Sequence, residues 1–346
     1  MRDATQKSLN QNIGFFCSPI GLGHATRDVA IAEFLDKTTQ FITGNGAAKL
    51  ISEYGFVVND KYIPPNFDVQ NGALQASLKW LWKYYQYYKD CKQISQKYIE
   101  EQNPKIIVSD EDFASLTMAQ QKKIPSILIT DILGTNFTSG IGSIIEKKMN
   151  KSMKEIIQKC NVVIMPENGP DQDNIKRVGP IVRSISQSRD ELRKRLGFEK
   201  KTITVSIGGT DAGKFLIEKT LETISKSKQD IDLVVVSGPS LKIQDKNVRN
   251  LGFVNNLHEI IYASDLVISL AGKSTIDESK AYGTPGIFIP IKGHFEQEDN
   301  AKNEGYSFDD IFRLDSLIEQ KLESKRIPTN SDGAKKAAEI ILRHLD

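Results

Sequence analysis

Cysteine is scarce in this sequence, and its few cysteines form no pattern. Cys17, Cys91 and Cys160 are far apart and include no C-x-x-C pair. A zinc site or a disulfide framework is therefore not expected. The three thiols are typical of small buried hydrophobic side chains in a reducing compartment.

Long hydrophobic runs are also missing. Nowhere do about 18 apolar residues follow one another, so we expect no transmembrane helix. The N-terminal residues MRDATQKSLNQN are polar and lack the apolar region of a signal peptide. These absences predict a cytoplasmic protein, or one that is peripheral on the inner face of the cell membrane.

Neither sign of charge prevails. The 46 basic and 44 acidic residues leave a net charge of +2, so no overall field favours nucleic acid as a partner. Hydrophobic residues at 39% and charged residues at 26% are typical of a water-soluble globular protein. A chain of 346 residues is too long for one ordinary core and predicts two domains of roughly 150 residues each.

Short apolar runs alternate with longer helical patterns along the chain. This rhythm predicts βαβ units and hence an α/β fold with parallel sheets. It pauses at residues 166–183, where proline and glycine are frequent, and this segment is predicted to be a linker. We expect one Rossmann-like domain at residues 1–165, a second at 184–331, and a last helix at 332–346 that packs back on the first domain. The expected strands are 13–18, 39–43, 105–109, 126–130 and 162–165, then 202–207, 233–237, 267–269 and 286–290.

The first expected strand leads into a glycine-rich turn. It contains Gly21, Gly23, His24 and Arg27 in the pattern G-x-G-H-x-x-R. Glycines let a ligand approach the backbone, and the helix start that follows offers unpaired N–H groups to a phosphate. The third glycine of the dinucleotide fingerprint is missing, so NAD binding is the weaker alternative. His24 at the helix start has a side chain that can titrate near neutral pH.

A second glycine loop follows the strand at 202–207. It begins Gly208-Gly209-Thr210 and continues to Gly213-Lys214, which fits the G-x-x-x-x-G-K phosphate loop of NTPases. The next residue is Phe215, so the hydroxyl that would hold Mg²⁺ in such a loop is missing. A plainer phosphate-binding turn fits the sequence better than an NTPase.

The densest pattern lies at residues 251–301. Gly272, Lys273, Ser274 and Thr275 follow a strand and open a helix, so amides, hydroxyls and a cation can meet a diphosphate there. Glu278, one turn further on, can accept hydrogen bonds from two ribose hydroxyls. Taken alone, Glu278 would suit an exposed helix charge better, and its neighbours are what favour the ribose.

This stretch resembles the C-terminal domain of glycosyltransferase family 28 over residues 201–305. The N-terminal G-x-G-H is similar to the first loop of that family, which faces the acceptor. Lys273, Ser274 and a histidine-to-asparagine spacing that is one residue longer depart from the family pattern and leave the donor sugar open. The matching positions are Gly208-Gly209-Thr210, Gly252-Phe253, Gly272 with Thr275 and Glu278, Gly283 with Pro285, and His294 with Gln297 and Asn300-Ala301.

The resemblance implies a GT-B fold, in which two Rossmann-like domains face each other across a cleft. It also implies metal-independent transfer of a sugar, an N-acetylhexosamine or a hexose, from a UDP-sugar to an acceptor hydroxyl. The UDP-sugar is a substrate, and no cofactor is implied. Hydrolysis of a nucleotide-sugar on the same fold and a non-catalytic nucleotide-sugar-binding subunit are the alternatives. By carry-over Phe253 lies near the base, Glu278 binds ribose, Gly209, Thr210 and Thr275 hold the diphosphate, and His294 and Gln297 meet the sugar or phosphate.

Transfer to a hydroxyl needs a base near the acceptor. His24 is one candidate for this catalytic role. Asp110, at the carboxyl end of the strand 105–109, is the other, and Asp131 after the strand 126–130 is a weaker third.

Residues 74–98 predict a long helix that carries aromatic and basic side chains. Aromatic residues among lysines suit an anionic lipid headgroup layer, and such a membrane face would imply a lipid-linked acceptor. An ordinary core helix with solvated lysines is the alternative. Helical spacing predicts a core face of Leu74, Leu78, Leu81, Tyr85 and Tyr88, and other faces with Trp80, Tyr84, Tyr87, Lys79, Lys83, Lys89 and Lys92. A second basic stretch comprises Lys147, Lys148, Lys151 and Lys154.

Overall fold

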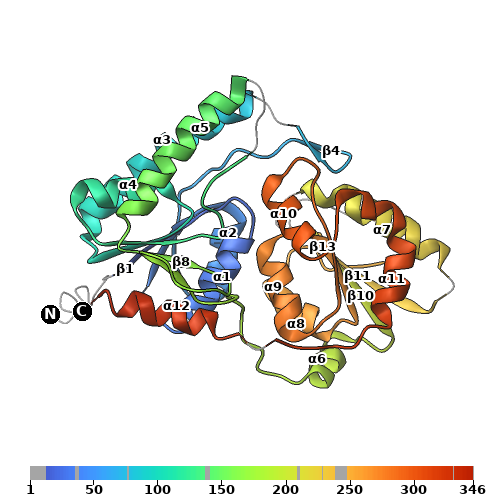
Figure 1. The fold of residues 1–346 in the computed structure, drawn as a ribbon. Coiled ribbons are helices and arrows are strands. Elements are labelled where there is room, and N and C mark those ends of the chain that lie inside the picture. The colour runs from blue at the N-terminus through green and yellow to red at the C-terminus, as the bar shows by residue number, and fades with distance from the viewer. Residues whose placement is uncertain are drawn as a thin grey trace. The chain divides into compact units, whose positions relative to one another are not determined.

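The chain divides into two compact units, each built on a parallel sheet (Figure 1). The computed structural model describes residues 13–35, 39–75, 78–136, 141–208, 211–227, 229–237, 248–329 and 331–345. The first unit holds residues 1–65, 78–181 and 332–346, and the second holds residues 66–77 and 182–331.

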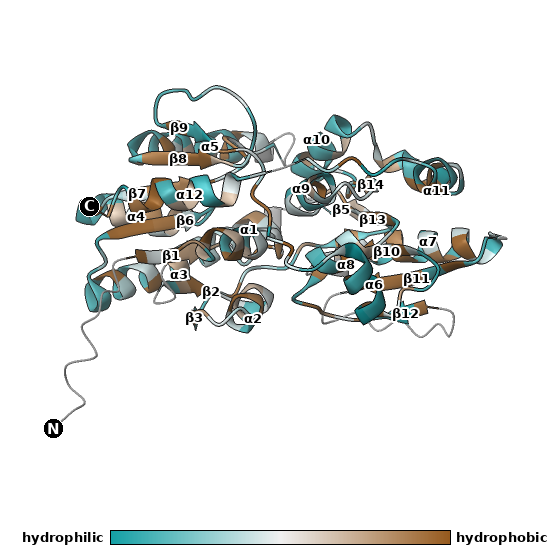
Figure 2. Ribbon diagram, turned by 90° about the horizontal axis from the view of Figure 1, so that it is seen from below, coloured by the Kyte–Doolittle hydropathy of each residue, from teal (hydrophilic) through white to brown (hydrophobic). Residues whose placement is uncertain are grey.

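The sheet of the first unit has the order β3-β2-β1-β6-β7-β8-β9, with every pair parallel. Its central strands are continuous apolar runs because helices cover both faces, and Figure 2 shows this hydrophobic character along β1, β6 and β8. The strands are β1 (Ile13–Cys17), β2 (Gln40–Thr43), β3 (Val57–Asp60), β6 (Ile106–Asp110), β7 (Ser126–Ile129), β8 (Val162–Met165) and β9 (Ile175–Arg177).

The helices of the first unit lie in two groups. In Figure 1, α3, α4 and α5 cover one face of the sheet, and α1, α2 and α12 cover the other. The last helix, α12, packs against α1, and its first residue Gly333 lies directly against the carbonyl oxygens of Gly179 and Pro180. The bounds are α1 (Gly23–Ala32), α2 (Asn45–Glu53), α3 (Leu78–Gln102), α4 (Phe113–Lys122), α5 (Ile141–Lys159) and α12 (Gly333–Leu342).

The sheet of the second unit has the order β12-β11-β10-β13-β14, again all parallel. Helices α6, α8 and α9 pack together on one side, and α7 packs with α11 on the other. The strands are β10 (Lys201–Ser206), β11 (Ile231–Val236), β12 (Val248–Asn250), β13 (Leu266–Leu270) and β14 (Gly286–Ile289). The helices are α6 (Arg189–Leu196), α7 (Lys214–Lys226), α8 (Leu257–Ala263), α9 (Lys273–Tyr282), α10 (Phe295–Asn303) and α11 (Leu314–Leu322), with short 3₁₀ turns at Asp211–Gly213 and Phe308–Arg313.

The segment 66–77 belongs to the second unit, so its assignment to a first domain of residues 1–165 is wrong. Strands β4 (Val69–Gln70) and β5 (Ala73–Leu74) pair antiparallel. The backbone amide of Leu74 donates to the carbonyl of Lys292 at 2.8 Å, and the amide of Lys292 donates to the carbonyl of Gly72 at 2.8 Å. These long-range hydrogen bonds attach the hairpin to the loop after β14, and the sequence carries no sign of them.

The predicted linker at residues 166–183 is also wrong in part. Residues 175–177 form β9, which pairs with β8 and closes the edge of the first sheet. The strand IKR is half-buried and polar because it lies at that edge, so it lacks the apolar run that marks an inner strand.

The predicted helix at 74–98 begins four residues later, at Leu78, because Leu74 belongs to β5. Its predicted faces are wrong in two places. Tyr85 is 48% exposed rather than in the core, whereas Tyr87 packs against the core and lies 6.1 Å from the ring of buried Tyr62. The described part of the chain contains no helix with the length and apolar character needed to cross a membrane.

Candidate functional site

In each sheet, two neighbouring central strands are the point, here called the reversal, from which the chain adds further strands in opposite directions. The first sheet winds outward in opposite directions from β1 and β6, and the second does so from β10 and β13. At such a point the loops that follow two neighbouring strands diverge, and ligands of open α/β sheets bind there, beyond the carboxyl ends. The residues that follow these four strands are therefore the first candidates for a function.

The reversal in the first unit brings together three residues predicted from the sequence. His24 and Arg27 lie on α1 directly after β1, and Asp110 ends β6. The Nδ1 atom of His24 lies 2.8 Å from Oδ1 of Asp110, and the Arg27 guanidinium donates to both oxygens of the same carboxylate. Asp110 is fully buried and Arg27 is 4% exposed. The fold thus joins residues that are 83 and 86 positions apart into one charged network.

The charges of this network fix its protonation near neutral pH. Burial lowers the pKa of His24, but the charges of Asp110 and Glu111 outweigh burial and raise that pKa to about 9. Burial raises the pKa of Asp110, yet the charges of Arg27 and His24 hold it well below its usual range. At neutral pH the His24 ring is therefore a cation and Asp110 an anion.

Two further carboxylates complete the network. Asp131 lies 3.5 Å from the Arg27 guanidinium, and this charge, opposed by burial, keeps the pKa of Asp131 below its usual range. Glu111, beside Asp110, has its pKa raised well above its usual range by burial and then by the charge of Asp131. Glu111 was not among the residues singled out from the sequence. Its only signal there was its place directly after a strand that ends in Asp110.

His24, Asp110 and Glu111 each place one potential metal-ligand atom within 4.8 Å of the others. However, both oxygens of Asp110 already accept hydrogen bonds from the Arg27 guanidinium. The positive charge that a metal would bring to this carboxylate is thus supplied by Arg27. The arrangement fits an ion-pair network better than a metal centre.

The glycine turn that precedes the network is built as expected from its sequence. Gly21 has a φ of +83°, which favours glycine, and α1 begins at Gly23. The turn therefore carries His24 to the carboxyl edge of the sheet.

In the second unit, the reversal places Gly208 after β10 and Gly272 after β13. Gly272 is the N-cap of α9, and its φ of −76° is open to any residue. A Cβ added at Gly272 would meet no described atom within 4 Å. Glycine is among the residues favoured at helix N-caps, and its missing side chain leaves the amides of this first turn open to a ligand. Gly209 and Thr210 lie outside the described residues.

The first turn of α9 holds Lys273, Ser274 and Thr275, as predicted. The ammonium group of Lys273 pairs with the carboxylate of Asp277 one turn later. This pairing satisfies part of the Lys273 charge within the helix. Positive charge at this edge comes from the helix N-terminus as well as from Lys273.

Glu278 is buried against an arginine that the sequence did not indicate. Its Oε1 accepts from Nε of Arg183 at 2.7 Å and its Oε2 accepts from Nη2 at 3.1 Å. The side chains are 1% and 3% exposed, and Arg183 also donates to the carbonyl of Asn255 at 2.8 Å. A carboxylate has about four lone-pair sites, so Glu278 keeps acceptor capacity beyond this pair. Arg183 follows the apolar residues 181 and 182, and nothing in that short run distinguishes a buried arginine from an exposed one.

The remaining donor-side residues lie around the same edge. Phe253 follows Gly252, whose φ is +61° and whose amide donates to Oδ1 of Asn250 at 3.0 Å. His294 is the N-cap of α10, with its ring 5.6 Å from that of Phe67, and burial lowers its pKa to about 4. Gln297 accepts from the amide of Ile291 at 3.0 Å, so it also shapes the loop after β14. Their roles in binding stay predictions.

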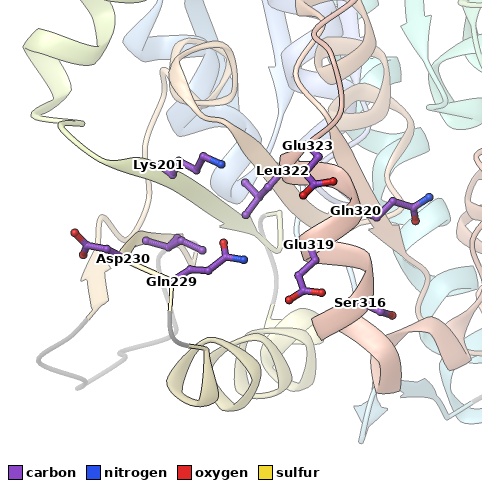
Figure 3. Close-up of a pocket in the computed structure, with 9 residues that line it drawn as sticks. Lys201, Gln229, Asp230, Ser316, Glu319, Gln320, Leu322 and Glu323 are labelled. Carbon is purple, nitrogen blue, oxygen red and sulfur yellow. The ribbon is translucent and has the colours of Figure 1, made fainter.

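A polar groove lies at the amino ends of the strands of this sheet (Figure 3). It is lined by Lys201 and Ile231, which begin β10 and β11, and by Glu319 and Glu323 near α11. The amino ends of parallel strands are not where α/β sheets bind ligands. We therefore place the candidate site at the carboxyl ends.

The family model for the glycosyltransferase family 28 C-terminal domain matches residues 202–325. An uncharacterised glycosyltransferase of Methanopyrus kandleri is 27% identical over 57% of this chain and 60% of its own length, less than two thirds of that relative. An uncharacterised glycosyltransferase of Methanosarcina acetivorans is 28% identical over 84% of this chain and 83% of its own. A relative from Caldicellulosiruptor saccharolyticus, 24% identical over 88% of this chain and 84% of its own, is named as an N-acetylglucosamine transferase that uses UDP-N-acetylglucosamine and a pyrophosphoryl-undecaprenol acceptor.

Solved structures support the same fold. The glycosyltransferase of kitacinnamycin superimposes with a TM-score of 0.65 over 96% of this chain and 99% of its own, at 15% identity. At that identity the likeness concerns the fold alone. The predicted fold is confirmed as α/β of the GT-B type.

Proposed function

We propose that this GT-B glycosyltransferase, whose second unit is a family 28 C-terminal domain, transfers a sugar from a UDP-sugar to an acceptor hydroxyl without a metal. The donor sugar in this proposal is an N-acetylhexosamine or a hexose. The observation that carries the proposal is Gly272, an unconstrained glycine at the start of α9 and at the reversal of the second sheet.

The diphosphate of the donor fits the start of α9. The first turn of a helix leaves backbone N–H groups without helical partners, and its dipole is positive at this end. Without a side chain at Gly272, phosphate oxygens can reach these amides, and Ser274 and Thr275 add hydroxyl groups in the same turn. As the bond to the sugar breaks, the same amides and Lys273 would stabilise the charge that develops on the leaving UDP.

The uridine fits the neighbouring loops. Glu278 lies on α9 one turn after Thr275, where its carboxylate can accept from ribose hydroxyls with the acceptor capacity that Arg183 leaves. Arg183 also holds the carbonyl of Asn255, in the loop where Phe253 is proposed to meet the base. His294 and Gln297 are proposed to meet the sugar or the phosphates.

The acceptor hydroxyl is proposed to approach the network of the first unit. Asp110 accepts from Nδ1 of His24, which leaves Nε2 as the ring nitrogen for the acceptor oxygen. His24 and Asp110, each a candidate base from the sequence, are proposed to act together at the acceptor hydroxyl, with Gly21, Gly23 and Arg27 supporting them.

A lipid-linked acceptor at a membrane surface is the finer part of the proposal. The relative from Caldicellulosiruptor saccharolyticus is named for such an acceptor. In the first unit, α3 exposes Trp82 at 62% and Tyr85 at 48%, and α5 exposes Ile144 at 68%. Exposed lysines accompany them on both helices, namely Lys83, Lys89, Lys147, Lys148, Lys151 and Lys154. Apolar side chains among lysines suit an anionic headgroup layer.

The donor site is tested by thermal stabilisation with UDP, UDP-N-acetylglucosamine and UDP-glucose, with GDP as the control nucleotide. A ligand that binds only the folded protein raises its melting temperature with concentration. We expect UDP and at least one UDP-sugar to stabilise the protein and GDP to have a smaller effect. No stabilisation by any uridine nucleotide would contradict the proposal.

Gly272→Ala sharpens this test. Since the added methyl group would meet no described atom within 4 Å, the free energy of unfolding should change by less than about 1 kcal/mol. The Kd for UDP, measured by calorimetry, should rise at least about 10-fold, equivalent to about 1.4 kcal/mol, because the methyl group keeps phosphate from the amides. Gly134→Ala, in the first unit and with its nearest described neighbour 3.9 Å away, is the matched control and should leave the Kd unchanged.

A further inference from the structure

Glu111 has a backbone conformation that its side chain does not favour. Its φ is +52°, in the left-handed region that glycine, asparagine and aspartate adopt most readily. Its amide donates to the carbonyl of Ile129 at 3.2 Å, which holds this conformation directly after β6. A non-glycine residue in this region costs on the order of 1–3 kcal/mol and tends to occur at functional sites.

The Glu111 carboxylate lies beside the His24 ring. Oε1 accepts from the Thr130 hydroxyl at 2.9 Å, from the amide of Asp131 at 3.3 Å and from the Arg27 guanidinium at 3.4 Å, so these donors meet Oε1 and not Oε2. Oε2 lies 3.8 Å from Nε2 of His24, too far for a hydrogen bond but close enough for one oxygen atom to reach both. The side chain is 12% exposed, so a ligand can reach it.

The two main candidate bases, His24 and Asp110, are committed to each other and to Arg27, and Asp131 also lies 3.5 Å from the Arg27 guanidinium. Both oxygens of Asp110 accept from Arg27, and Oδ1 also pairs with His24. His24 carries a proton at neutral pH, so it can donate to an oxygen but has no free electron pair with which to take a proton.

We propose that Glu111 is the catalytic base and that it takes the proton of the acceptor hydroxyl through Oε2, while the His24 cation stabilises the acceptor oxygen. This inference rests on the proposed function. The O–H bond of the acceptor breaks and its proton moves to Glu111. The acceptor oxygen bonds to the anomeric carbon of the sugar, and the bond from that carbon to the diphosphate oxygen breaks, its electron pair leaving with UDP. Glu111 then releases the proton to solvent, and no oxidant or reductant is involved.

The surroundings of Glu111 raise the pKa of its carboxyl group. Burial and then Asp131 raise its pKa well above the usual carboxyl range, while the charges of His24 and Arg27 oppose that rise. A side-chain hydrogen bond with Asp131 also raises the pKa of Glu111. From α3, Tyr84 faces Glu111 as well: burial raises the pKa of Tyr84 most, and the charge of Glu111 adds to that rise. A raised pKa places the loss of the Glu111 proton closer to the working pH, where general bases are most effective.

The test measures UDP release from UDP-N-acetylglucosamine by the full chain, with water as the acceptor, as a function of pH. We expect Glu111→Gln to lower turnover at least about 100-fold and to abolish the rise of activity on the acid side, with the Kd for UDP unchanged. His24→Gln should lower turnover but keep that rise. Glu101→Gln, an exposed glutamate at the end of α3, is the control and should match the wild type.

A direct titration decides the matter independently of turnover. In spectra of ¹³C-labelled glutamate, assigned by comparison with Glu111→Gln, the Glu111 carboxyl should titrate above the ordinary value of about 4.3. Thr130→Val removes a hydrogen bond to its charged form and should move this midpoint to higher pH. A normal midpoint, or full activity of Glu111→Gln, overturns the role of Glu111. A wild type that neither binds UDP nor releases it overturns the proposed function instead.

Discussion

At the scale of single residues, both candidate sites are organised by a buried arginine. Arg27 holds Asp110 in the first unit, and Arg183 holds Glu278 in the second, each with the two side chains less than 5% exposed. Burying two charges costs free energy that their attraction does not always recover, so such pairs are weak evidence for stability. Both arginines instead fix the direction of a carboxylate. The sequence indicates Arg27 and Asp110 as separate loop residues, but nothing in it reveals that they pair.

The shifted pKa of His24 predicts a dependence of stability on pH. A folded-state pKa of about 9 lies above the unfolded value of 6.5, so the folded state binds the proton more tightly. The stabilisation is complete below pH 6.5 and is lost as the pH rises through 9. This pKa shift corresponds to a contribution of at most about 3 kcal/mol to the free energy of unfolding.

We therefore expect the free energy of unfolding of the wild type, from urea titrations between pH 6 and 10, to fall by up to about 3 kcal/mol through this network. His24→Asn should remove most of this fall between pH 6 and 10, whereas His344→Asn, on the turn after α12, should keep it. Equal slopes in the wild type and His24→Asn would contradict the ion pair with Asp110.

At the scale of helices and strands, the sequence predicts what local patterns determine. The inner strands are mostly apolar or β-branched, and each was predicted within two residues at either end, as was the apolar edge strand β14. The edge strands β3, β9 and β12 carry the sequences VVND, IKR and VRN, and polar edge strands give no such run. The faces of α3 were mistaken because Tyr62, which is distant in sequence, decides which of its tyrosines is buried. The glycine turns were predictable for the opposite reason, since their residues are consecutive.

The hairpin β4–β5 gives a prediction at this scale. A Cβ at Gly72 would lie 2.8 Å from the ring of Phe308 and 2.9 Å from that of Phe215, and its φ is +74°. Gly72→Ala should therefore cost about 1 kcal/mol for the backbone and a further 1–3 kcal/mol for the overlap. Thermal unfolding measures this loss of stability, and faster proteolysis within residues 66–77 would show that the hairpin has detached from the second unit.

Gly305→Ala is the control for the backbone cost. Its φ is +81°, and a Cβ there would meet no atom of the described ranges within 4 Å. For Gly305→Ala we expect only the backbone cost of about 1 kcal/mol, and no change in the proteolysis of the hairpin. If both variants lose the same stability, the contacts of Gly72 with the two rings do not hold the hairpin.

At the scale of the whole molecule, the chain passes between the two units four times, at residues 65–66, 77–78, 181–182 and 331–332. The sequence predicts two of these passages, near the linker and before the last helix. It does not predict the two that flank the hairpin, since those depend on hydrogen bonds between residues more than 200 positions apart. Each unit repeats one arrangement, a parallel sheet with a reversed order and functional candidates at the reversal. The two halves of a transfer reaction, donor and acceptor, are thus proposed for two separate sheets.

Attachment of the whole molecule to a membrane is the prediction that belongs to this scale. The net charge of +2 is too small to draw the protein to an anionic surface by itself, so binding must come from a local face. The face proposed here combines exposed Trp82 and Ile144 with the lysines of α3 and α5.

We expect the protein to co-sediment with phosphatidylglycerol vesicles at low salt and to be released by high salt, which screens the lysines. The double change Trp82→Ala with Ile144→Ala should weaken binding at least about 10-fold, because burying one large apolar side chain contributes about 1.5–3 kcal/mol. Phe312→Ala removes a side chain that is 64% exposed on the second unit and should leave binding unchanged. An equal effect of both changes would mean that general hydrophobicity, and not this face, holds the protein to lipid, and no binding at low salt would remove the membrane surface from the proposal.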